Sequence, residues 1–116
     1  MKRDYSLYIK DILDSISLIE DFIGNINFDE FTKDKKTSSA VIYQIEIIGE
    51  AAKQIPKDKR TKYQAVPWQD MAGMRDKIIH FYFGVDHEIV WKVIKEDLPI
   101  LKKEFVRILA ELKGEV

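Results

Sequence analysis

Residues 5–23, YSLYIKDILDSISLIEDFI, decide the class of fold. Their apolar side chains recur at steps of three and four, at Tyr5, Tyr8, Ile9, Ile12, Ile16, Ile19 and Ile23. Because an α-helix completes a turn every 3.6 residues, this spacing gathers them in one stripe. Asp4 can cap the start of the helix and Gly24 can end it. The stretch therefore predicts a long amphipathic helix with one face in a core.

The same helical periodicity continues along the chain. A stripe at Val41, Ile45, Ile48, Ala52 and Ile55 predicts a second helix from about Thr37 to Ile55, which Pro56 stops. Between these helices, the polar residues 25–36 predict a loop with one short helical turn. After the second helix, residues 57–64 predict a basic connector.

Two further helices are expected in the C-terminal half. Met71, Met74, Ile78 and Phe81 predict a helix from Pro67 to Gly84. Asp86 can cap a last helix, whose stripe is Val90, Ile94, Leu98, Leu101, Phe105, Ile108 and Leu112. Pro99 lies inside this helix and lacks an N–H, which predicts a kink or a break near Asp97 and Leu98.

No strand-like alternation competes with the helical pattern. Four main helices with short connections predict an all-α, antiparallel four-helix bundle with one or two short extra helices. We expect a single domain over residues 1–116. Trp91 and Ile100 add apolar surface beyond one face, which favours a two-fold dimer over a well-packed monomer.

Composition excludes several classes of function. The chain has 116 residues, a formal net charge of −1 and no cysteine, so it has no disulfide framework, no cysteine-ligated zinc and no thiol nucleophile. The near-zero charge argues against nonspecific binding of polyanions, although it allows a local basic patch. The N-terminus lacks the apolar core of a signal peptide, and no apolar stretch approaches the roughly 20 residues of a membrane span. We therefore expect a soluble, cytoplasmic protein.

Residues 74–84, MRDKIIHFYFG, concentrate the groups that could carry chemistry. On a helix Arg75 and Tyr82 share a face, and Asp76 and His80 are neighbours one turn apart. Arg75 and His80 diverge by roughly 140° on a straight helix, so one helix does not aim both at one atom. Either the helix unwinds near its end, or two copies meet and each lends a residue. The second alternative predicts a site at a dimer interface.

Such a set of side chains suits phosphodiester cleavage without a metal ion. An imidazole at His80 can exchange a proton near neutral pH, Asp76 can orient it, and the guanidinium of Arg75 suits a phosphoryl oxygen. RNA supplies the internal 2′-hydroxyl that such cleavage uses. The alternative is a polar helix face with an ion pair. His80 and His87 lack the companions of a zinc site, so no metal is expected.

These segments together resemble a known family, the HepT-like ribonuclease toxins of the HEPN superfamily. The resemblance covers nearly the whole chain and includes AVIYQIEIIGEAA at residues 40–52, VPW at 66–68, MAGMR at 71–75, HFYFGVD at 80–86, Trp91 and DLP at 97–99. The R-x4-H-x-Y signature of that family corresponds here to Arg75, His80 and Tyr82.

The resemblance implies a metal-independent endoribonuclease toxin of a type II toxin–antitoxin pair. It implies a homodimer that cleaves RNA in a shared cleft, with Arg75 and His80 as the catalytic pair and Asp76 in support. It also implies an antitoxin partner, an MNT-type nucleotidyltransferase, which would inactivate the toxin by adenylylating Tyr82. The alternative is a non-catalytic HEPN module that binds a nucleotide or docks a nucleotidyltransferase. No cofactor is expected.

Several residues outside the motif have both a functional and a structural interpretation. Glu50 could pair with a buried arginine such as Arg75 or face solvent, and Glu46 could take the same role. Gly49 lies inside a helix, where glycine costs about 1 kcal/mol, so we expect a close helix–helix approach there. Trp68 and Trp91 are expected to anchor the core rather than stack on bases.

The densest basic cluster lies in and before the connector. It consists of Lys53, Lys57, Lys59, Arg60 and Lys62. These side chains could guide RNA phosphates or an acidic partner, or they could form a solvated loop.

Overall fold

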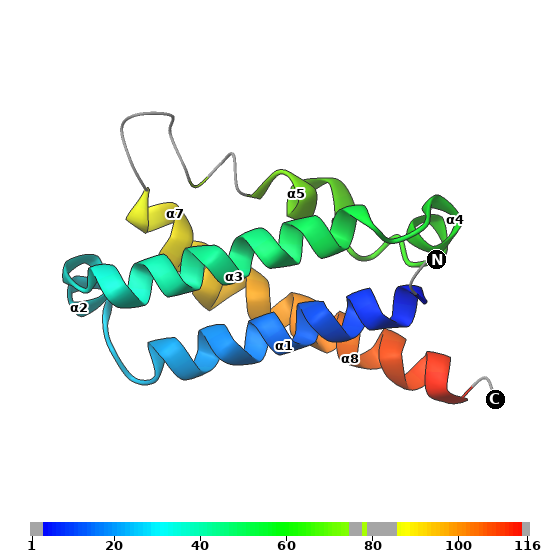
Figure 1. The fold of residues 1–116 in the computed structure, drawn as a ribbon, viewed down its shortest axis with the longest axis horizontal. Coiled ribbons are helices and arrows are strands. Elements are labelled where there is room, and N and C mark those ends of the chain that lie inside the picture. Colours follow the sequence, from blue (N-terminus) through cyan, green and yellow to red (C-terminus); the bar gives the residue numbers. More distant parts are fainter. Residues whose placement is uncertain (1–3, 75–77, 79–85, 115–116) are drawn as a thin grey trace.

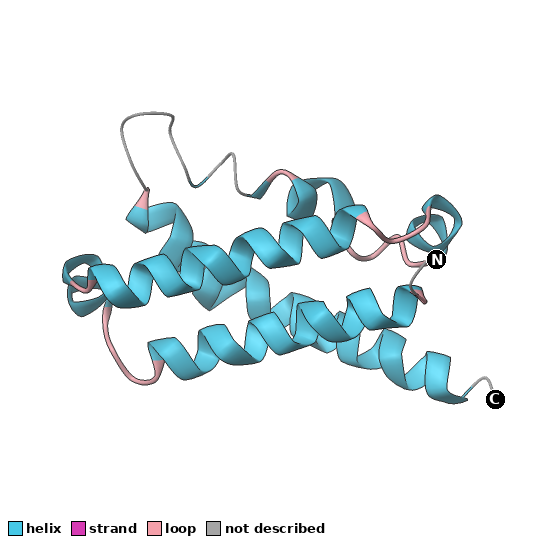
Figure 2. Ribbon diagram, in the orientation of Figure 1, coloured by secondary structure: helices cyan, strands magenta, loops and turns pink. Residues whose placement is uncertain are grey.

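The computed structural model describes residues 4–74, 78 and 86–114. Over these ranges the chain is built from helices and contains no strand (Figure 2). The three long helices are α1 (Tyr5–Ile23), α3 (Lys35–Lys53) and α8 (Leu98–Gly114). The predicted all-α bundle is confirmed.

The long helices form the body of an elongated molecule of 47 × 29 × 27 Å. Helices α1 and α3 run antiparallel along each other, and α8 packs against α1 (Figure 1). The start of α1 and the end of α8 lie at the same end of the molecule. The described shorter helices are α2 (Phe28–Lys33), α4 (Lys57–Lys62), α5 (Trp68–Ala72) and α7 (His87–Lys92).

Helix α1 has the ends that the sequence predicts. The Asp4 carboxylate accepts a hydrogen bond from the backbone N–H of Ser6 at 3.0 Å, and this bond lowers the pKa of Asp4. At the other end Gly24 adopts a φ of 51°, and its N–H donates to the carbonyl oxygen of Glu20 at 2.9 Å. A side chain at this left-handed position would be strained, so glycine ends the helix cleanly.

The predicted apolar stripes form one core. The buried residues cluster together, and they include Ile9, Ile12, Ile16, Ile19 and Ile23 of α1, Val41, Ile45 and Ile48 of α3, and Leu98, Leu101, Phe105 and Ile108 of α8. Tyr5, Tyr8 and Leu112 are partly buried against it. No described helix is long and apolar enough to cross a membrane.

The loop between α1 and α3 contains the expected helical turn, which is α2. Asn27 starts it with a reciprocal capping box. The Asn27 side chain accepts from the N–H of Glu30 at 2.9 Å, and the Glu30 side chain accepts from the N–H of Asn27 at 3.1 Å. Phe31 is fully buried, so this short helix is fastened to the core by one aromatic ring.

Helix α3 starts two residues earlier and ends two residues earlier than predicted. Asp34 caps its start, with its carboxylate accepting from the N–H and the hydroxyl of Thr37 at 3.0 and 2.7 Å. These bonds, the one from the hydroxyl first, hold the pKa of Asp34 below its ordinary value of 3.8.

The basic connector predicted over residues 57–64 contains a helix that the sequence analysis did not predict, because residues 57–62 form α4. The carbonyl oxygen of Pro56 accepts from the N–H groups of Lys59 and Arg60, both at 3.0 Å. Proline is compatible with a helix start, since it needs no N–H there. The proline that stops α3 therefore also starts α4.

The helix predicted from Pro67 to Gly84 is also corrected. Helix α5 ends at Ala72, and the N–H of Gly73 donates to the carbonyl oxygen of Gln69 at 3.0 Å. Met74 and Ile78 are helical again and buried, as their place in the stripe predicts. Phe81 and the expected end at Gly84 lie outside the described residues.

The irregularity predicted at Pro99 appears as a π-helical turn, η2 (Val93–Asp97), between α7 and α8. The N–H of Leu98 donates to the carbonyl oxygen of Val93, five residues earlier. This wider turn precedes the proline, whose ring would crowd the carbonyl of an ordinary preceding turn. The helix thereby continues through Pro99 without a break.

Gly49 marks the close approach that the sequence predicts. A methyl group placed on Gly49 would lie 3.2 Å from the carbonyl oxygen of Met71 and 3.7 Å from that of Ala72. Gly49 is buried, and both carbonyls belong to the last turn of α5. Helix α5 thus rests on the bare backbone of α3, and a side chain larger than hydrogen would push it away.

We predict that Gly49→Leu lowers the free energy of unfolding by about 1–3 kcal/mol, because the side chain must displace the backbone of α5. Urea denaturation measures this loss. Ser39→Leu is the matched control, since Ser39 is an exposed residue of α3 and the new side chain displaces nothing. Equal stability of the two variants would contradict the close approach.

A second prediction concerns the charge of the Asp34 cap. Its pKa is lower in the folded chain than in the unfolded one, so its stabilisation is complete above about pH 4–5 and is lost as the pH falls through the folded pKa. The stability gap between the wild type and Asp34→Ala should therefore shrink in acid. Asparagine caps without a charge, so the gap between Asp34→Asn and Asp34→Ala should stay constant. Urea denaturation from pH 7 to pH 2.5 tests both, and parallel curves for wild type and Asp34→Asn would refute the prediction.

Candidate functional site

The predicted motif residues Arg75, Asp76, His80 and Tyr82 lie outside the described residues. Their predicted roles therefore stay predictions. The structure does describe residues that flank the motif in sequence and one residue inside it. These are Met74, Ile78 and Asp86, and they fix where the motif segment joins the bundle.

Two buried side chains anchor the motif segment to the core. Met74 directly precedes Arg75 and is 6% exposed, and Ile78 lies between Asp76 and His80 and is fully buried. The two residues are four apart, so both fit one face of a helix. The core therefore holds the chain immediately beside the predicted catalytic pair.

A hydrogen bond joins Ile78 and Asp86, the described residues on either side of residues 79–85. The N–H of Asp86 donates to the carbonyl oxygen of Ile78 at 2.8 Å. The Asp86 carboxylate also accepts from the N–H of Ile89 at 3.1 Å and caps α7, as the sequence predicts. Asp86 thus joins the end of the motif segment to the start of the last helical run.

Glu50 lies on the exposed side of α3. Its carboxylate is 3.2 Å from the Nζ of Lys53, and its side chain is 69% exposed. This placement agrees with the solvent-facing interpretation, and pairing with Arg75 is left as a prediction. Glu46, one turn earlier, is half-buried.

The two tryptophans occupy different positions. Trp68 is buried, its Nε1 donates to the carbonyl oxygen of Tyr63 at 3.0 Å, and its ring packs edge-on against Phe105. The prediction that it anchors the core is confirmed. Trp91 is half-buried against the rings of Phe28 and Phe31, so it also packs inward rather than standing free for stacking.

The structure divides the predicted basic cluster into two groups. Three of its lysines contact carboxylates: Lys53 contacts Glu50, Lys59 contacts Asp58 at 3.9 Å, and Lys62 contacts Glu111 at 3.6 Å. The other two members, Lys57 and Arg60, line an open groove between α4 and α5.

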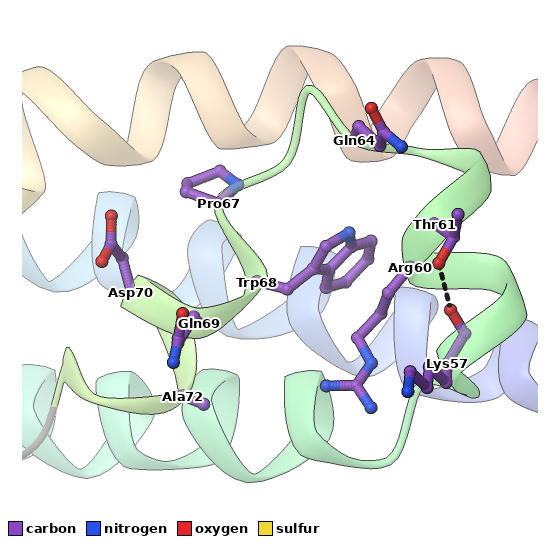
Figure 3. Close-up of a pocket in the computed structure, with 9 residues that line it drawn as sticks. All are labelled: Lys57, Arg60, Thr61, Gln64, Pro67, Trp68, Gln69, Asp70 and Ala72. Atoms are coloured by element: carbon purple, nitrogen blue, oxygen red, sulfur yellow. Dashed lines mark hydrogen bonds between the residues drawn. The ribbon is translucent and has the colours of Figure 1, made fainter.

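The groove has a volume of about 640 Å³. Its lining consists of Lys57, Arg60, Thr61, Gln64, Pro67, Trp68, Gln69, Asp70 and Ala72 (Figure 3). Six of these nine side chains are polar or charged, and they come from α4, from α5 and, for Gln64, from the turn between the two helices. The sequence interpretation did not separate these elements. The contributions of Thr61, Gln64 and Gln69 were missed for this reason. The signal that could have found them is Pro56, which starts α4.

In the portion of the chain that the structure describes, no group of three or more His, Asp or Glu side chains is arranged to hold a metal ion. His87 is described, and its ring packs edge-on against Phe31 at 5.9 Å. His80 and Asp76 are not covered by this observation.

The helical bundle and the motif spacing define a class of small all-α proteins with an Arg–His pair. The family model described as ribonuclease HepT-like matches residues 12–108. The chain belongs to the HepT-like ribonuclease family. The resemblance drawn from the sequence is thereby confirmed at the level of the family.

Individual relatives match over nearly their full lengths. A Thermococcus cleftensis protein named "Probable ribonuclease HepT" is 51% identical over 108 residues, which cover 93% of this chain and 98% of the relative. A Methanocaldococcus jannaschii protein named a "Putative RNase" is 46% identical over 114 residues, covering 98% and 94%. Another from Caldanaerobacter subterraneus, named in the same way, is 42% identical over 106 residues, covering 91% and 95%. No solved structure matches the chain significantly.

We predict that Asp86→Ala destabilises the protein by about 1 kcal/mol or more, because α7 loses its cap. Asp86→Asn is the matched control, since asparagine caps as well as aspartate and should stay within a few tenths of a kcal/mol of the wild type. Urea denaturation gives both values. If the alanine variant were as stable as the wild type, the Asp86 carboxylate would not stabilise α7 as its cap.

Proposed function

We propose that this chain is a metal-independent endoribonuclease and the toxin of a type II toxin–antitoxin pair. One observation carries the proposal: a member of the HepT-like ribonuclease family has Arg75, His80 and Tyr82 at the spacing of the R-x4-H-x-Y signature. The names of relatives that align over almost their whole lengths support the nuclease activity.

The proposed reaction is an internal transesterification of RNA. His80 removes the proton of a 2′-hydroxyl, and the 2′-oxygen attacks the adjacent phosphorus. The bond from phosphorus to the 5′-oxygen breaks, and that oxygen leaves with a proton from a second imidazole. Arg75 stabilises the charge that develops on the phosphoryl oxygens, and Asp76 orients the imidazole. The products are a 2′,3′-cyclic phosphate and a 5′-hydroxyl.

A homodimer supplies the two imidazoles that this reaction needs. One straight helix does not direct Arg75 and His80 at the same atom, whereas two copies of the motif across a cleft place two of each near one phosphate. One copy of His80 then acts as the base and the other as the acid. RNA cleavage in a cleft between two protomers follows from this division.

Control of the toxin is proposed to act on Tyr82. An MNT-type nucleotidyltransferase antitoxin would transfer AMP from ATP to its phenolic oxygen, which attacks the α-phosphorus as pyrophosphate leaves. The added phosphate carries negative charge into a site that must accept the RNA backbone, so modification opposes substrate binding. Such a modified protein would be inactive without any change in fold.

The test is RNA cleavage in EDTA by the purified chain. We expect His80→Ala to lower the rate by about 10²–10⁴-fold and Arg75→Ala by about 10²–10³-fold, because each removes a group that acts in the transition state. His87→Gln is the control, since His87 is a second histidine that packs against Phe31 and should retain activity.

Intact mass establishes in the same preparation whether Tyr82 is adenylylated. If both motif variants cleaved RNA as fast as wild type, the catalytic assignment would be wrong. Absence of cleavage by unmodified wild type would contradict the nuclease and favour the module that docks a nucleotidyltransferase.

A further inference from the structure

Arg60 stands out among the basic side chains because one of its donors is buried without a partner. Its Nε is closed off from solvent and makes no hydrogen bond within the described residues. A buried donor that lacks an acceptor lowers the stability of the fold, more so when the group is charged. Such a group in a native protein calls for a structural or functional explanation.

The surroundings place the Arg60 guanidinium in the groove rather than on a free surface. Its side chain extends from α4 into the space beside the Trp68 ring, and Lys57 lies on the same wall (Figure 3). The groove lining contains one carboxylate, from Asp70, at the far end of the groove from Lys57 in this view. Two cations and one anion leave a net charge of +1, with the positive charge concentrated at the α4 end.

The groove has a defined shape, because hydrogen bonds and ring packing hold several of the residues that line it. Trp68 is held by its bond to the Tyr63 carbonyl and by the Phe105 ring, so its wall is rigid. Thr61 has its hydroxyl bonded to the Lys57 carbonyl oxygen at 3.0 Å, within α4. The amides of Gln64 and Gln69 add neutral donors and acceptors on the two sides. A planar guanidinium with amides around it suits a phosphodiester with its ribose.

The groove also lies close to the predicted catalytic pair along the chain. Its lining ends at Ala72, three residues before Arg75. Three residues of chain span at most about 11 Å. A short RNA strand that reaches the motif therefore has neighbouring phosphates within reach of this groove.

We propose that the groove between α4 and α5 is a phosphate subsite for single-stranded RNA, with Arg60 as its anchor and Lys57 as its second cation. The subsite binds a phosphodiester away from the one that is cleaved, and so it holds the strand without taking part in the reaction. The proposal rests on the ribonuclease function proposed above and assigns a position to the substrate. In this proposal Lys57 and Arg60 contact the strand. The other three lysines of the cluster do not, because each already contacts a carboxylate; these are Lys53, Lys59 and Lys62.

The test measures binding of a fluorescent, fully 2′-O-methylated oligonucleotide by the full chain, because this strand cannot be cleaved. We expect Arg60→Gln to weaken binding about tenfold or more at low salt, since it loses a charged hydrogen bond. The slope of log affinity against log salt should fall by about 0.7, as for one lost phosphate contact on a single strand. Lys57→Gln should weaken binding several-fold, and Arg60→Lys should restore part of the affinity.

Lys53→Gln and Lys62→Gln are the matched controls, because they remove the same charge outside the groove. Each should stay within about twofold of the wild type. Equal losses for Arg60→Gln and Lys53→Gln would show a response to net charge alone and would overturn the subsite. So would unchanged binding by both groove variants. Lys57 is exposed, so its variant keeps the test valid even if Arg60→Gln perturbs the fold.

Cleavage kinetics separate the subsite from the ribonuclease proposal. With a cleavable strand, Arg60→Gln should raise KM about tenfold and leave kcat within about twofold, as expected for binding that is equal in ground and transition states. Arg60-dependent binding without any cleavage by wild type would refute the nuclease and leave the anion subsite standing. Arg60-dependent binding of an acidic peptide, with no binding of the oligonucleotide, would overturn the RNA subsite in favour of a protein partner.

Discussion

The packing of α3 on α5 at Gly49 is the constraint on which the site depends. The missing side chain lets the last carbonyls of α5 come within contact distance of the α3 backbone, so α5 has one position along α3. The chain then runs from Ala72 into the buried Met74, and the motif follows directly. The same short helix forms one wall of the groove with Arg60. A glycine in α3 thereby sets where the chain enters the motif segment, at Met74, and the position of one wall of the proposed phosphate subsite.

Asp86 connects the bundle to the other side of the motif, as Met74 does on the first side. Its backbone N–H donates to the carbonyl oxygen of Ile78, and its carboxylate caps the start of α7. From there the chain passes through the π-helical turn into α8, which contributes Leu98, Leu101 and Phe105 to the core. The segment that carries the predicted chemistry is therefore connected at each side to buried, hydrogen-bonded structure. A site supported in this way can hold charged groups close together at the surface while the core supplies the stability.

The sequence predicts the long elements well because their signals are local and redundant. Helix α1 has a stripe of isoleucines, an aspartate cap and a terminal glycine, and all three agree with the structure. The short helix α4 was missed because KDKRTK has no apolar stripe, and its start depends on Pro56, which was interpreted only as a stop. The end of α5 at Ala72 was missed because the stripe from Met71 to Met74 and Ile78 continues past it. An apolar stripe indicates which face of a helix is buried, but it does not reveal a local interruption of that helix.

The candidate site, like the fold, could be predicted from the sequence only in part. The family and the motif spacing follow from the sequence, since R-x4-H-x-Y lies between matching segments. The division of the basic cluster could not be predicted, because it depends on which lysine meets a carboxylate from a distant helix, as Lys62 does with Glu111. The groove likewise depends on how α4 and α5 face each other, which no local pattern encodes.

The most direct test of the central claim is the chemistry of the product ends. The unmodified chain, in EDTA, would be given an oligoribonucleotide and the same sequence with 2′-deoxyribose at the cleaved position. We predict a 2′,3′-cyclic phosphate and a 5′-hydroxyl from the first strand and no cleavage of the second at that position, because the 2′-hydroxyl is the nucleophile. Cleavage of the deoxy-substituted position, or products ending in a 5′-phosphate, would contradict it.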